Sequence, residues 1–103
     1  GVPRSGVMLR EELERLAAMF PSVGDVRSAG LMGAVEFVKS RSGKEPDAAL
    51  AREVFFRARQ NGLEAILSGH ILRLAPPLNV AAADLEEGMA ILRRSIEQVT
   101  KKG

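Results

Sequence analysis

Two kinds of hydrophobic periodicity alternate along this chain, and their order constrains its fold more than any other feature. Apolar residues recur at helical spacing in three segments, at about 7–20, 48–61 and 85–99. Two pairs of short apolar runs lie between them, the first on either side of Gly30 and the second on either side of the turn at 68–69. This order predicts an α+β fold (α-β-β-α-β-β-α), with a small antiparallel sheet of about four strands and three helices packed on one face.

Local signals mark where several of these elements begin and end. Pro21 ends the first helix, Asp47 can cap the start of the second, and Gly62 suits the left-handed position just past its end. The last helix has no clear start signal within 81–84. We expect the strands at about 23–29, 31–38, 63–67 and 70–75.

Each predicted helix carries one apolar stripe, as helices that cover a sheet do. With 103 residues and 46% hydrophobic content, the chain is large enough for one compact core. We expect these stripes to be buried: Leu9, Leu13, Leu16 and Phe20; Leu50, Val54 and Ala58; Leu85, Met89, Leu92, Ile96 and Val99.

Composition excludes several kinds of site. The chain has no cysteine, so it can form neither a disulfide nor a thiolate metal site. Its net charge is only +2, with basic and acidic residues interspersed, and it has no Trp or Tyr for base stacking, which argues against nucleic-acid binding. No apolar run is long enough to cross a bilayer, and no signal peptide is visible. We expect a cytoplasmic protein that binds neither nucleic acid nor membrane.

The N-terminus is expected to lie outside the folded unit. Residues 1–6 are predicted to be a flexible segment or a remnant of an expression vector, and residues 7–103 to form one domain.

Few residues could carry chemistry. His70 is the only histidine, so this chain cannot build a His-based metal cluster, and a structural or solvated role in a turn before a strand is the simpler expectation. Gly24, Gly30 and Gly33 lack the spacing of a phosphate-binding loop and precede a strand pattern, so we expect them to permit a tight turn and close strand approach.

Glu36 is unusual because it lies inside an apolar strand. Alternation places it on the same face as Met32 and Ala34, opposite Val35 and Phe37. A charge there must face solvent or find a partner. Solvent is the simpler expectation.

Arg73 is the strongest candidate for a binding residue. It lies inside the strand 71–75, directly followed by Pro76-Pro77, and proline keeps the preceding residue extended. Its planar guanidinium could therefore be aimed at a carboxylate for a bidentate contact. From its chemistry alone, an outward-facing surface arginine remains the alternative.

Four segments that occur in the same order resemble the C-terminal small domain of class III aminotransferases, which are pyridoxal-phosphate enzymes of fold type I, and the resemblance covers about residues 7–99. They agree with the element order read independently from periodicity. These segments are 23–38, Lys44-Glu45-Pro46, Asn61-Gly62-Leu63 and Ile71-Leu72-Arg73-Leu74-Ala75-Pro76-Pro77-Leu78.

The resemblance implies a part of an enzyme that transfers an amino group from an amine or amino acid to a keto acid through pyridoxal 5'-phosphate. It also implies that Arg73 binds the substrate carboxylate. The Schiff-base lysine and the cofactor's phosphate loop would lie in a large domain, since no lysine here (Lys39, Lys44, Lys101, Lys102) matches the family's lysine segment. The isolated chain is therefore expected to be inactive, and the parent enzyme to be a homodimer.

Two other function classes remain open. The chain could be a free-standing α+β module for ligand binding or interaction without catalysis, or a structural or oligomerisation piece, which has the least support. Within the family, ω-amino acid, acetylornithine-like and dialkylglycine-type substrates are all open, and a general ω-amino acid enzyme is favoured.

Overall fold

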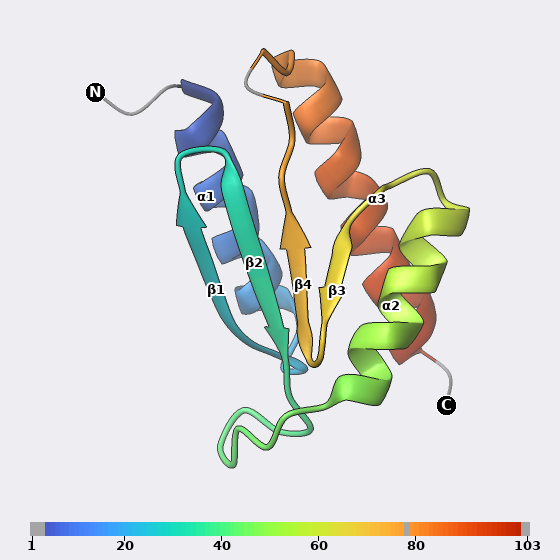
Figure 1. Cartoon of the computed structure of the whole chain (residues 1–103). Coiled ribbons are helices and arrows are strands. Elements are labelled where there is room, and N and C mark those ends of the chain that lie inside the picture. Colours follow the sequence, from blue (N-terminus) through green and yellow to red (C-terminus); the bar gives the residue numbers. More distant parts are fainter. Residues whose placement is uncertain (1–3, 78, 102–103) are drawn as a thin grey trace.

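The computed structural model describes residues 4–77 and 79–101. It confirms the α+β class and the predicted element order (Figure 1). The elements are α1 (Arg4–Met19), β1 (Val23–Ala29), β2 (Met32–Phe37), α2 (Ala48–Gln60), β3 (Ile66–Ser68), β4 (Ile71–Leu74) and α3 (Ala82–Thr100). No helix within these residues is long and apolar enough to cross a membrane.

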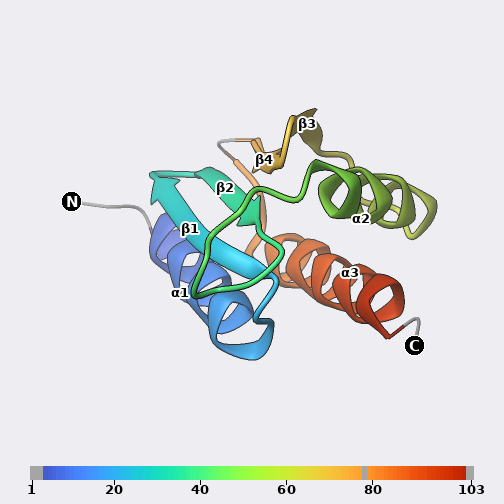
Figure 2. The same ribbon diagram turned by 90° about the horizontal axis from the view of Figure 1, so that it is seen from below.

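The four strands form one antiparallel sheet in the order β1-β2-β4-β3. All three helices lie on one side of it, as Figure 2 shows in the view from below. Helix α1 contacts β1 and β2, α2 contacts β2, β3 and β4, and α3 packs against α1 and α2. Among the described residues, the opposite side of the sheet carries no helix.

The core lies between the sheet and the helices. The predicted stripes of α1 and α3 are buried, and they meet the inward-facing side chains of β2 and β4 in one cluster. In α2, Val54 and Ala58 are buried and Leu50 is partly buried. Ser95 is a buried polar residue whose hydroxyl donates to the Ile91 carbonyl at 2.8 Å and accepts from Asn61 Nδ2 at 3.0 Å.

The predicted ends of α2 are confirmed. Asp47 Oδ1 accepts a hydrogen bond from the Leu50 N–H at 3.0 Å, and Gly62 adopts φ 104° just beyond the helix. Helix α3 has Ala81 at its N-cap and no side-chain capping bond, which explains its indistinct start in the sequence.

Two predicted boundaries are wrong. Helix α1 begins at Arg4 rather than at residue 7, and it buries Gly6; residues 1–3 lie outside the described part. Strand β3 begins at Ile66 rather than at Leu63. The Leu63 N–H still donates to the Ala58 carbonyl, at 2.8 Å, so that stretch completes the cap of α2 before it can join the sheet.

Candidate functional site

The uncovered side of the sheet, here called the open face, is the candidate site. Strand alternation and cross-strand register place side chains from all four strands on it. A shallow hollow of about 530 Å³ lies over this face. The side chains on the open face are those of Asp25, Arg27, Ala29, Met32, Ala34, Glu36, Ile66, Ser68, Ile71 and Arg73.

Arg73 occupies the inner strand β4, where its Cα partners are Ala34 on β2 and Ile66 on β3. Its neighbours along the strand, Leu72 and Leu74, are buried in the core, so the backbone at Arg73 is held from both sides and from beneath. The side chain itself is exposed on the open face. Within the described residues it forms no hydrogen bond or ion pair, so its guanidinium is free for a ligand.

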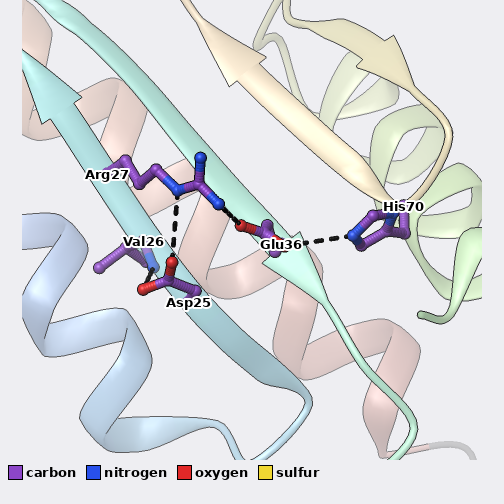
Figure 3. Close-up of polar contacts among 5 residues, drawn as sticks. All are labelled: Asp25, Val26, Arg27, Glu36 and His70. Carbon is purple, nitrogen blue, oxygen red and sulfur yellow. Dashed lines mark hydrogen bonds and ion pairs between the residues drawn. The ribbon is translucent and has the colours of Figure 1, made fainter. Parts of the chain in front are cut away.

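Beside Arg73, the same side of the molecule carries a group of polar residues that contact one another (Figure 3). We call it the Glu36 cluster, and it comprises Asp25, Arg27, Glu36 and His70. Arg27 Nη2 donates to Glu36 Oε2 at 2.6 Å, and Arg27 Nε donates to Asp25 Oδ2 at 3.3 Å. The other oxygen of Glu36 lies 3.2 Å from His70 Nε2. The hydrogen bond to Asp25 and the negative charge of Glu36 both raise the pKa of the Arg27 guanidinium.

The predicted face of Glu36 is correct, but the expected solvation is wrong. Its side chain is only 19% exposed and lies between two basic partners. His70 lies in the turn before β4, as predicted, and its ring nitrogen Nε2 is within hydrogen-bonding distance of the Glu36 carboxylate. Alternation within one strand shows which face a side chain occupies, whereas these partners depend on which strands pair.

The glycines and potential metal ligands add no further site. Gly30 adopts φ 58° in the tight turn between β1 and β2, as predicted. Gly33 is packed against the Leu13 side chain, in keeping with close approach. In the described part of the chain, no group of three or more His, Asp or Glu residues is placed to hold a metal ion.

The described residues do not fit a covalent site for pyridoxal phosphate, which requires a lysine aimed at a pocket. Lys39 and Lys101 are exposed and lie near Glu45 and Glu97, at 4.0 Å and 3.9 Å. Lys44 is exposed in the loop before α2, and none of these three lysines lines the hollow on the open face. Lys102 lies outside the described residues.

Comparison with known proteins gives a consistent result. The family model for class III aminotransferases matches residues 1–96. A leucine/methionine racemase from Thermococcus litoralis is 38% identical over 95 residues, which are 91% of this chain and 21% of that protein. A 4-aminobutyrate aminotransferase from Escherichia coli is 32% identical over 96 residues, covering 90% of this chain and 22% of that protein.

Solved structures show the same likeness. The omega transaminase from Pseudomonas jessenii, in complex with PMP, superimposes with a TM-score of 0.89 at 29% identity, over 95% of this chain and 22% of that one. The chain thus spans between a fifth and a quarter of the length of the proteins it matches.

Proposed function

The chain belongs to the class III aminotransferase family, and on this premise we propose that it is the small C-terminal domain of a pyridoxal-phosphate-dependent aminotransferase whose Arg73 binds the substrate carboxylate. The family match over residues 1–96 and the fold likeness support the family part of the proposal. The chain's limited share of its relatives' length means that the cofactor site and the rest of the reaction would come from residues beyond this chain. The cofactor, when bound there, supplies the electron sink for amino transfer.

The observation that carries the role of Arg73 is the contrast between the two arginines of the open face. Arg27 is bound by Asp25 and Glu36, whereas Arg73 has no partner among the described residues. A planar guanidinium on a fixed strand, with its donors unused, suits bidentate binding of a carboxylate. Binding there would hold the substrate in one orientation relative to the cofactor without any covalent step on this chain.

The names of the relatives support a carboxylate as the group recognised. Leucine, methionine and 4-aminobutyrate, named for the two relatives above, all carry one. Those names cover racemisation as well as amino transfer, so the carboxylate site is the part of the proposal that holds for either reaction. For this chain we propose transfer from an amine or amino acid to a keto acid.

The test is Arg73→Lys in the complete enzyme, because lysine keeps the charge but loses the planar fork. Loss of one or two charge-assisted hydrogen bonds predicts a fall in kcat/KM of about tenfold or more for carboxylate substrates. Amines without a carboxylate are the substrate control, and Arg93→Lys, an exposed arginine on α3, is the matched variant. Equal losses for both substrate types, or unchanged kinetics, would return Arg73 to an ordinary surface role.

A further inference from the structure

Helix α1 ends with a carbonyl group that its own backbone cannot satisfy. In an α-helix, the Ala17 carbonyl would accept a hydrogen bond from the N–H four residues later, but that residue is Pro21, which has no N–H. The preceding carbonyl, that of Leu16, still accepts from the Phe20 N–H at 3.0 Å. The described last turn of α1 holds no basic side chain that could replace the missing donor. The donor must therefore come from water or from another part of the chain.

Arg41, in the loop between β2 and α2, supplies this donor. Its Nη2 donates to the Ala17 carbonyl, and also to the Phe20 carbonyl at 3.0 Å. The positive charge of the guanidinium lies near the negative end of the α1 dipole, which is a further favourable interaction. Figure 1 shows the loop at the same end of the molecule as the turn from α1 into β1. Arg41 is thus a C-capping residue that comes from a distant part of the sequence.

The loop that carries Arg41, residues 39–46, is held together by its own backbone. The Lys39 N–H donates to the Glu45 carbonyl, and the Lys44 N–H donates to the Ser40 carbonyl, both at 2.9 Å. An isolated β-bridge closes the base of the loop. Because the loop is internally bonded, a contact made at one of its residues fixes the position of the whole loop.

We propose that Arg41 is a latch that fastens the 39–46 loop to the C-terminal end of α1, so that the loop and the last turn of α1 open together. One nitrogen serves both carbonyls, so its loss removes both hydrogen bonds at once. The loop leads directly into Asp47, whose N–H donates to the Phe37 carbonyl at 2.9 Å and whose side chain caps α2. The latch therefore also holds the chain where α2 begins. This inference is independent of the proposed role of Arg73, and all its contacts lie within this chain.

The test is amide hydrogen exchange, measured by NMR on the full 103-residue chain with Arg41→Met. Methionine keeps an unbranched side chain but has no donor and no charge. The matched control is Arg10→Met, because Arg10 is exposed on α1 but lies away from its last turn. The reporters are the amides of Lys39 and Lys44 in the loop and of Phe20 at the end of α1. The same spectra show that each variant is folded.

In Arg41→Met, exchange of all three reporter amides should become roughly five- to tenfold faster, the size expected when the net contribution of a charge-assisted hydrogen bond is lost. The reference is the Lys101 amide, which donates to the Glu97 carbonyl at 3.0 Å at the far end of α3. Its exchange reports fraying of α3 and should stay the same. Arg10→Met should change none of the reporters by more than about twofold.

Faster exchange at Phe20 alone would mean that Arg41 caps α1 without fastening the loop. Faster exchange at Lys39 and Lys44 alone would mean that the loop is anchored without capping the helix. Either result would break the coupling and refute the inference. Unchanged exchange at all three amides would make the contact of Arg41 an ordinary surface contact. Since the kinetics of Arg73→Lys do not bear on these rates, the latch and the proposed function can fail separately.

Discussion

Replacing Leu92 with alanine tests how α3 closes the core. Leu92 is 0% exposed and lies in the middle of α3, which packs against both α1 and α2. The substitution removes three carbon atoms, which lose about 0.8 kcal/mol each in transfer free energy. The cavity left behind adds a further cost, because close-packed neighbours relax only partly. We expect the free energy of unfolding to fall by about 2–5 kcal/mol, a large share of the roughly 5–15 kcal/mol typical of a domain.

The assay is chemical denaturation followed by far-UV circular dichroism, since the chain has no Trp or Tyr to report by fluorescence. Arg94→Ala is the matched control, because Arg94 is exposed on the same helix. It should change the free energy of unfolding by less than about 0.5 kcal/mol. A similarly small change for Leu92→Ala would show that α3 buries a different face.

Three further results are expected. Gly24→Ala should destabilise the fold by about 1–3 kcal/mol in the same assay, because a Cβ there would lie 2.5 Å from Cγ1 of the buried Val38; unchanged stability would mean that this part of β1 is free to move. Glu36→Ala should lower the melting temperature more than Glu86→Ala, an exposed substitution on α3, because it removes the carboxylate that Arg27 and His70 share. Equal effects would mean that the Glu36 cluster adds no measurable stability. The purified chain, supplied with pyridoxal phosphate and an amino donor, should show no turnover and no stoichiometric visible absorbance from covalently bound cofactor, and either signal would place a cofactor lysine in this chain.

The element order could be predicted because each helix must bury one continuous stripe and each strand alternates. The stripe through Leu92 and Ile96, for example, is incompatible with a strand, and its burial is confirmed. The short β3 could not be predicted in the same way. The apolar pattern continues through Leu63 and Ala65, but the Leu63 N–H is used by the α2 cap, and hydrophobicity carries no information about where a backbone donor points.

For the open face, the sequence showed which side of the sheet each side chain occupies, but not which side chains lie next to one another. Alternation was enough to place Glu36 opposite Val35, and a two-residue turn beginning at Gly30 could have shown that Arg27 lies diagonally across from it. The contact with His70 could not be found this way, because it requires β2 to pair with β4, a non-local choice.

The environment of Arg73 shows the same limit. Its outward direction follows from the burial of Leu72 and Leu74 on either side of it. Its two cross-strand partners, Ala34 and Ile66, follow from the strand order β1-β2-β4-β3, which local patterns do not determine. The apolar surroundings of the arginine therefore became visible only in the folded sheet.

The most direct test of the role of Arg73 is a crystal structure of the complete enzyme with a bound unreactive carboxylate such as 4-methylpentanoate. The proposal predicts that both carboxylate oxygens accept hydrogen bonds from the Arg73 guanidinium, at about 2.7–2.9 Å. A carboxylate held by other residues, with Arg73 directed into solvent, would contradict it.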